Sequence, residues 1–138
     1  MDWKSELLNE PFAAGRRRYF VELKELEQGN RLLKVTELSG GRKSSFILAR
    51  EDLESFREKF ATLAADLNKS RSFKLDCSFE KDRQVNVDLS KNEKGAYFCL
   101  KSQTLGSDRQ PKIFIDADRK DEVEYFISLL DKVIEFKE

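Results

Sequence analysis

Histidine is absent from the 138 residues, and cysteine occurs only twice. The side chain that most often binds metals and acts as a general base near neutral pH is therefore missing. The two cysteines, Cys77 and Cys99, do not form a CxxC pair and lie in strand-like segments. We expect two reduced thiols, with no metal ion and no other cofactor.

The sequence also lacks the motifs of an enzyme. No serine or cysteine lies in a nucleophile motif, and Gly40-Gly41 is too short for a phosphate-binding glycine loop. Asp116, Asp118 and Asp121 resemble a magnesium site in spacing, but acidic side chains are ordinary in the first turn of a helix, where they interact favourably with the helix dipole. We therefore expect a protein that is not an enzyme.

Long hydrophobic runs are missing as well. No segment approaches the roughly 20 apolar residues of a membrane span, and the first residues do not have the pattern of a cleaved leader. These absences predict an intracellular protein that lies in the cytoplasm, with a nuclear location as the alternative.

Alternating apolar and polar residues are frequent in the first half. The alternation predicts strands over residues 16–25, 31–38 and 44–49, each with one buried face. Residues 1–15 show little periodicity and are expected to form a short strand or a cover over the core. From residue 51 to about 68 the period becomes that of a helix. The apolar stripe of this helix consists of Leu53, Phe56, Phe60, Leu63 and Leu67.

The second half repeats this order, with strands predicted at residues 73–79, 85–90, 96–101 and 112–117. A short basic loop from Lys91 to Gly95 separates the middle two strands, and a helix begins near Asp118, whose carboxylate is expected to be the N-cap. Two landmarks keep nearly the same offset, since Lys34 precedes Lys101 by 67 residues and Gly29 precedes Gly95 by 66. The two helix stripes match at an offset of 70 residues: Leu53, Phe56, Phe60 and Leu63, then Val123, Phe126, Leu130 and Val133.

We therefore predict an α+β fold made of two copies of a ββββα unit, residues 1–68 and residues 69–138. The chain is long enough for one domain, and packing the two copies as a pseudo-twofold pair would bury both helix stripes. One face of each sheet would stay open.

Charge is distributed unevenly, although 26 basic and 26 acidic residues cancel. Residues 16–49 carry eight basic and four acidic side chains, and residues 69–115 carry ten and six. The remaining segments, which include both predicted helices, are acidic. A polarised surface of this kind attracts polyanions, but acidic helix starts and scattered lysines also occur on many domains without such partners.

Aromatic rings accompany the cations on the predicted open faces. Phe20 shares a strand face with Arg18 and Lys24. Single-stranded nucleic acid binds to such surfaces because each stacked base contributes about 1–3 kcal/mol and cations neutralise phosphates.

The same combination recurs in the second half. Lys91, Asn92 and Lys94 lie in the short loop, and Tyr97 follows on the face that it shares with Lys101. This loop is our first candidate for contact with a flexible anionic strand.

These segments resemble the PUR repeat of purine-rich-element-binding proteins and their shorter bacterial relatives. KNEKGAYF at residues 91–98 is similar to the basic-Asn-basic-Gly loop of that family and the aromatic residue after it. RRYFVELK at residues 17–24 resembles the first long strand, and residues 54–57 and 124–126 resemble the helix start. The resemblance extends from about residue 16 to 136.

The resemblance implies that the two repeats form one PUR domain with a Whirly-like fold. It also implies binding of single-stranded DNA or RNA, sequence-tolerant or with a preference for purines, in the regulation of transcription or nucleic-acid metabolism. Carried over by position, Asn92 and Lys94 would contact the strand, and Tyr97 would stack on bases or separate them.

The first copy departs from the family pattern. Lys24 is retained, but Leu26 and Gln28 stand near the positions of the Asn and the second basic residue. Ala96 in the second copy replaces a residue that is often basic. We expect weaker or less selective binding, with electrostatic help from three basic residues of the first copy: Arg16, Arg18 and Lys34.

One alternative remains open at the level of sequence. The same open sheets could bind a partner protein or a second copy of the chain as a homodimer, without needing the basic loop.

Overall fold

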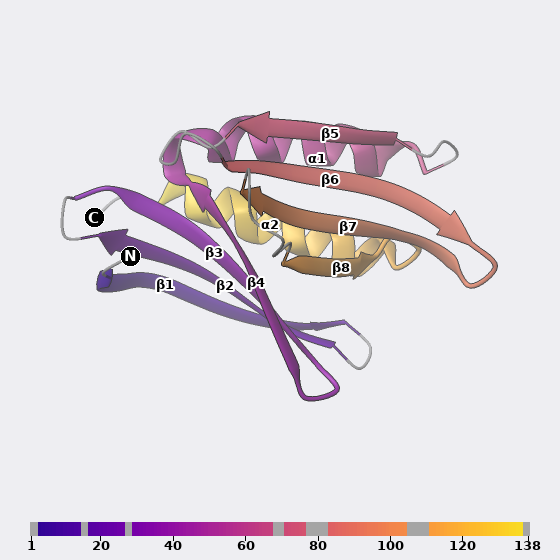
Figure 1. Cartoon of the computed structure of the whole chain (residues 1–138), viewed down its shortest axis with the longest axis horizontal. Coiled ribbons are helices and arrows are strands. Elements are labelled where there is room, and N and C mark those ends of the chain that lie inside the picture. The colour runs from indigo at the N-terminus through magenta and orange to yellow at the C-terminus, as the bar shows by residue number, and fades with distance from the viewer. Residues whose placement is uncertain are drawn as a thin grey trace.

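The computed structural model describes residues 3–14, 17–26, 29–67, 71–76, 83–104 and 111–136. Two four-stranded antiparallel sheets, each followed by a helix, make up the fold (Figure 1). The N-terminal sheet has the order β1 (Trp3–Ala14), β2 (Arg17–Leu26), β3 (Arg31–Ser39) and β4 (Arg42–Ala49). The C-terminal sheet has the order β5 (Arg71–Asp76), β6 (Arg83–Asn92), β7 (Gly95–Thr104) and β8 (Lys112–Asp116).

The helices α1 (Leu53–Ala65) and α2 (Lys120–Glu135) each follow the last strand of one sheet. The expected α+β class and the two ββββα units are therefore confirmed. The predicted boundary between residues 68 and 69 lies outside the described residues, as do Arg16, Cys77 and Gln28. Neither α1 nor α2 has the length and apolar character needed to cross a bilayer.

The first strand is longer than expected, because β1 runs for 12 residues. Its pairing with β2 shifts register between Trp3 and Ser5 and again between Glu6 and Leu8. Such bulges interrupt the two-residue alternation, which explains why residues 1–15 show no clear periodicity. The first helix also begins differently: a 3₁₀ turn over Arg50–Asp52 precedes α1.

Alternation fixes which side of each strand is buried. On β2, Tyr19, Val21 and Leu23 are fully buried, whereas Phe20 on the opposite face is half-buried and Arg18 is exposed. On β6 and β7, one face is buried in the same way, and the other face carries polar residues and Tyr97. The predicted open face is present on the C-terminal sheet. On the N-terminal sheet the corresponding face is partly covered, because Leu26, Leu32 and Ala49 form a second buried cluster on it.

One core joins the two units. Phe60 of α1 lies 4.7 Å from Phe98 of β7 and 5.3 Å from Phe126 of α2, between ring centroids. Phe56 packs on Phe60 and on Phe46 of β4. All five rings are fully buried, so aromatic contacts connect both helices with both sheets.

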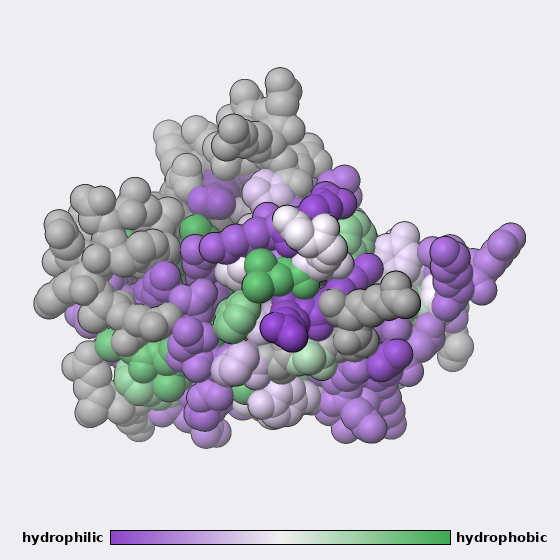
Figure 2. Space-filling view, turned by 90° about the horizontal axis from the view of Figure 1, so that it is seen from below, coloured by the Kyte–Doolittle hydropathy of each residue, from purple (hydrophilic) through white to green (hydrophobic). Residues whose placement is uncertain are grey.

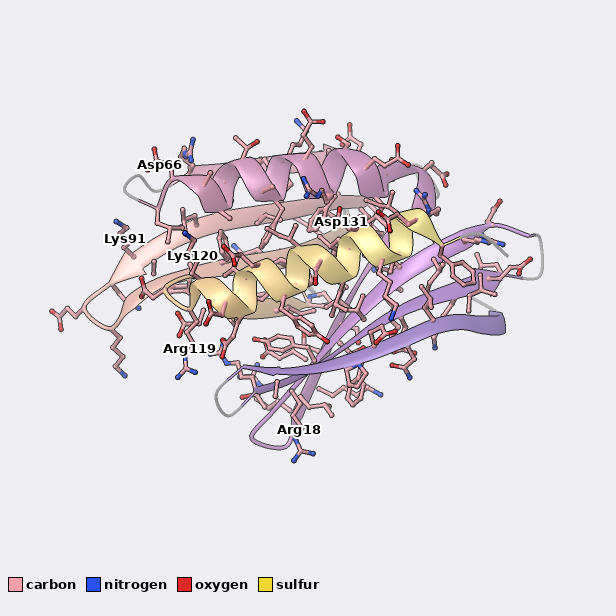
Figure 3. All side chains as sticks on the ribbon, turned by 180° about the vertical axis from the view of Figure 1, so that it is seen from behind. Arg18, Asp66, Lys91, Arg119, Lys120 and Asp131 are labelled. Carbon is pink, nitrogen blue, oxygen red and sulfur yellow. The ribbon has the colours of Figure 1, made fainter. Side chains whose placement is uncertain are left out.

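Both helices lie on the same side of the C-terminal sheet, and the N-terminal sheet crosses beside them (Figures 1 and 3). Arg57 of α1 donates two hydrogen bonds, of 2.8 and 3.2 Å, to the carboxylate of Asp131 on α2. The sheets meet where β3 and β4 approach β7 and β8. This meeting line carries the candidate site.

Candidate nucleic-acid interface

A groove with a volume of about 650 Å³ lies where the two sheets meet. The N-terminal sheet contributes Arg17, Tyr19 and Ser39. The rest of the lining comes from the β6–β7 hairpin, from β8 and from the start of α2: Asn92, Lys94, Gly95, Ala96, Tyr97, Phe114, Asp116 and Arg119. Three residues predicted from the sequence, Asn92, Lys94 and Tyr97, are therefore brought together at one groove.

The hairpin is tighter than the expected loop from Lys91 to Gly95. Strand β6 continues to Asn92, and only two residues turn before β7 begins at Gly95. Within this turn the Asn92 Oδ1 accepts a hydrogen bond of 2.8 Å from the Lys94 N–H. The side chains of Lys91, Asn92 and Lys94 are all exposed.

Asp118 anchors this hairpin and is not the N-cap that we expected. Helix α2 starts at Lys120 with Arg119 as its N-cap residue. The Asp118 Oδ2 instead accepts a hydrogen bond of 2.6 Å from the Ala96 N–H. Gly95, with φ of 130°, leaves room for this carboxylate, because a Cβ there would lie 2.0 Å from the Asp118 Oδ2. The anchor links the hairpin to the approach of α2.

Tyr97 is half-buried, not fully exposed, because its ring packs beside Phe114 of β8 at a centroid distance of 6.0 Å. The Arg17 guanidinium lies over the Phe114 ring at 5.6 Å. A ring pair with a neighbouring guanidinium offers stacking surfaces and positive charge together.

The backbone of Phe114 is bonded by side chains of the other sheet. Glu37 accepts a hydrogen bond of 2.7 Å from the Phe114 N–H. The Phe114 carbonyl accepts one of 3.0 Å from Arg17 and another from the Tyr19 hydroxyl. Burial, followed by the nearby Glu37, raises the pKa of Tyr19 to about 12. The tyrosine is therefore a neutral donor at physiological pH.

Basic and acidic side chains both lie at the end of the molecule that carries the β6–β7 hairpin, where Glu93 is in the turn and Asp118 contacts Ala96. Figure 3 shows Lys91, Arg119 and Lys120 at this end, and Figure 2 shows hydrophilic side chains covering it. Arg119 forms ion pairs with Asp116 at 3.6 Å and with Glu122 at 3.2 Å. In the described part of the chain, no acidic side chain pairs with Lys91 or Lys94.

The other predicted residues do not line the groove. Arg18, Phe20, Lys24 and Lys34 lie together on the open face of the N-terminal sheet, where Lys24 pairs with Glu22 at 3.3 Å. The face shared by Arg18, Phe20 and Lys24 was predicted correctly, whereas the position of Lys34 beside them was not predicted.

Lys101 lies on the open face of the C-terminal sheet, four residues along β7 from Tyr97, or about 13 Å. It pairs with Asp88 at 3.4 Å. Cys99, between them on β7, is free and buried, and burial raises the pKa of its thiol. A thiol of this kind stays protonated near neutral pH.

Asp116 and Asp118, whose spacing resembles that of magnesium ligands, are already hydrogen-bonded. The Asp116 Oδ1 accepts a bond of 3.0 Å from the Asp118 N–H, and Asp118 holds Ala96. Within the described ranges, no group of acidic or cysteine residues has the arrangement of a metal site.

Sequence reasoning missed Arg17, Phe114 and Arg119 as groove residues. A signal for Phe114 existed, because it alternates with Ile113 and Ile115 and so shares the open face of Lys112. No local pattern could reveal Arg17, because its partner Phe114 lies 97 residues away.

A groove that combines the adjacent rings of Tyr97 and Phe114 with lysine and arginine side chains is typical of proteins that bind flexible anionic strands. A protein-family model described as PurA single-stranded-DNA- and RNA-binding protein matches residues 4–137. The chain therefore belongs to the PurA family of single-stranded-DNA- and RNA-binding proteins.

Comparison with solved structures gives matches of low sequence identity. The plant transcriptional regulator PBF-2 matches with a TM-score of 0.48 and 18% identity, covering 95% of this chain and 81% of that chain. WHY3 from Arabidopsis thaliana has a TM-score of 0.46 and 19% identity, covering 95% and 88%. WHY1 from the same plant has a TM-score of 0.46 and 18% identity, covering 95% and 90%. None of the curated protein sequences compared with the chain gives a significant match.

Proposed function

We propose that this protein binds single-stranded DNA or RNA in the groove between its two sheets, with the two units acting as one domain. The observation that carries the proposal is the joint position of Asn92, Lys94 and Tyr97 at this groove, next to the ring of Phe114 and the guanidinium of Arg17. Family membership supports the class of ligand.

Each part of the groove has a distinct role in this proposal. The rings of Tyr97 and Phe114 stack on bases, at about 1–3 kcal/mol for each base. Lys91 and Lys94 neutralise phosphates, and the exposed Asn92 amide donates hydrogen bonds to phosphate or base oxygens. A preference for purines follows from their larger stacking area, and a regulatory role in gene expression is the use that we propose for such binding.

The basic open face of the N-terminal sheet would extend the contact. Arg18 and Lys34 form no ion pair with any described residue and are available to phosphates, while Phe20 offers part of one ring face. Lys24 and Lys101 would first have to leave Glu22 and Asp88.

The direct test is a titration of labelled oligonucleotides by fluorescence anisotropy at two ionic strengths. Purine-rich and pyrimidine-rich sequences are compared, each single-stranded and double-stranded. We expect tighter binding of single strands, tightest for purines, with an affinity that falls steeply as salt rises.

The Asn92→Ala, Lys94→Glu double variant should weaken binding and lower the slope of log affinity against log salt by about 0.7 for each phosphate that the protein no longer neutralises. Lys59→Glu on α1 is the matched control, since it makes the same charge change at an exposed site outside the groove.

A different result would support an interface for proteins. If no oligonucleotide binds and sedimentation shows a homodimer that Lys94→Glu leaves intact, the nucleic-acid proposal is wrong. The described surface gives little support to that outcome, since Tyr125 is the one exposed large hydrophobic residue among those whose side-chain burial is described.

A further inference from the structure

Phe114 lies on β8, which is the edge strand of the C-terminal sheet. The backbone N–H and carbonyl of Phe114 are hydrogen-bonded by protein side chains and do not depend on water. Three side chains of the N-terminal sheet bond these two groups. Glu37 accepts a hydrogen bond from the N–H, and Tyr19 and Arg17 donate hydrogen bonds to the carbonyl. An edge strand normally leaves such groups to solvent or covers them with another segment.

This arrangement requires polar groups in the interior. Tyr19 is fully buried, and Glu37 is 8% exposed. Burying a hydroxyl or a carboxylate costs free energy unless its hydrogen bonds are made. Both side chains hydrogen-bond to the backbone of one residue, Phe114, so the backbone that carries this ring is fixed from the opposite sheet.

The ring of Phe114 is also one side of the groove. It packs on Tyr97, and Arg17 lies over it. A stacking surface that is ordered before binding loses less conformational freedom when a base arrives. A frayed edge strand would instead have to be ordered at that moment.

We propose that Tyr19 and Glu37 are positioning residues of the stacking surface, so that base stacking on Phe114 and Tyr97 depends on both sheets. The inference rests on the proposed function and adds to it. It makes the N-terminal unit part of the base-binding site of the C-terminal unit, although neither positioning residue needs to touch the nucleic acid.

The test separates stacking from charge. The full chain is titrated with a single-stranded oligonucleotide and with an abasic strand of equal length and charge, and the ratio of the two affinities measures stacking. Tyr19→Phe removes only the hydroxyl that binds the Phe114 carbonyl. We expect it to lower affinity for the intact strand about two- to tenfold, the range of one hydrogen bond, with unchanged affinity for the abasic strand.

Three further variants separate the positioning role from a general loosening of the fold. Thr36→Val removes another buried hydroxyl of the N-terminal sheet, which bonds Ser45 at 3.0 Å and does not reach the groove. Thr36→Val should lower the melting temperature about as much as Tyr19→Phe does. It should nevertheless leave the affinity ratio unchanged. Glu37→Gln keeps an acceptor for the Phe114 N–H and should preserve the ratio, whereas Glu37→Leu should reduce it.

The outcomes distinguish this inference from the proposed function. If the wild-type protein binds strands and stacks bases, but Tyr19→Phe and Glu37→Leu leave the ratio unchanged or lower both affinities equally, the positioning role is wrong and the function stands. If the wild-type protein binds neither strand, the proposed function fails, and the inference fails with it.

Discussion

The open faces of the two sheets differ in charge and in aromatic content. On the N-terminal sheet, the described residues of this face include four basic side chains and one acidic side chain: Arg18, Lys24, Lys34, Lys43 and Glu22. On the C-terminal sheet, three lysines are balanced by three aspartates: Lys74, Lys101, Lys112, Asp76, Asp88 and Asp116. The C-terminal face carries two adjacent rings, and the N-terminal face carries the half-buried ring of Phe20.

Under the proposed function, the two copies of one architecture would contribute differently to binding. The N-terminal sheet supplies most of the unbalanced positive charge, which acts over about 10 Å at ordinary ionic strength. The C-terminal sheet supplies stacking surface, which requires contact. The groove joins the open face of the C-terminal sheet to the opposite face of the N-terminal sheet, which contributes Arg17, Tyr19 and Ser39.

The shared core should make the two units unfold together, which is the largest effect that we predict. Phe60→Ala removes a fully buried ring that contacts Phe98 and Phe126 of the other unit. Loss of a buried phenylalanine side chain costs about 3–5 kcal/mol. Chemical denaturation should show one transition at a lower midpoint, followed identically by circular dichroism and fluorescence. Two separate transitions would contradict the common core, and the exposed Tyr125→Ala is a control expected to change stability little.

The hairpins of the two units should respond differently to loss of glycine. Gly95→Ala strains a residue with φ of 130° and places a Cβ 2.0 Å from the Asp118 carboxylate. We expect a loss toward the upper end of about 1–3 kcal/mol in unfolding free energy. Gly40 in the β3–β4 turn also has positive φ, but its added Cβ meets no atom within 4 Å, so Gly40→Ala should cost only about 1 kcal/mol.

A double-mutant cycle of Gly95→Ala with Asp118→Ala isolates the steric part of this effect. The double variant should be more stable than the sum of the two single losses predicts, because the clash disappears with the carboxylate. Additive losses would show that Asp118 does not hold the hairpin as described.

Much of this architecture could be predicted from the sequence because it depends on local periods. Alternation placed Phe20 and Tyr97 on open faces and Tyr19 on a buried one, and the helix stripes identified Phe56 and Phe60 as core. The repeat followed from the offsets between these landmarks. Residues 3–8 could not be assigned in this way, because register shifts in β1 hide the alternation.

The site was only partly predictable. Asn92, Lys94 and Tyr97 are neighbours in sequence, and a motif can show them. The contacts of Arg17 and Glu37 with Phe114 depend on the angle at which the two sheets cross. No local sequence pattern predicts that angle. Asp118 was misassigned for the same reason, since an N-cap is a local role and its actual partner, Ala96, lies 22 residues away.

Aromatic substitution compares the two faces directly. Tyr97→Ala should reduce the free energy of binding a single strand by about 1–3 kcal/mol, the value of one stacked base. Phe20→Ala should reduce it less, because Phe20 has no aromatic neighbour among the described rings and lies outside the groove. Isothermal titration with one oligonucleotide gives both values. Equal losses would mean that the two sheets bind bases equivalently, contrary to the division of work described above.

The smallest effect that we predict is a loss of stability at high pH, which involves Tyr19 at the contact between the two sheets. The folded protein raises the pKa of Tyr19 from 10.0 to about 12, so between these values the folded state holds a proton that the unfolded state has lost. This contribution to stability is fully present below pH 10 and is lost as the pH rises toward 12.

At pH 11 this contribution to stability should have fallen by about 1 kcal/mol. The measurement is the difference between wild type and Tyr19→Phe in urea denaturation at pH 9 and pH 11, because contributions common to both proteins cancel in it. The stability gap between the two proteins should shrink as the pH rises, and a constant gap would mean that folding does not raise the pKa of Tyr19.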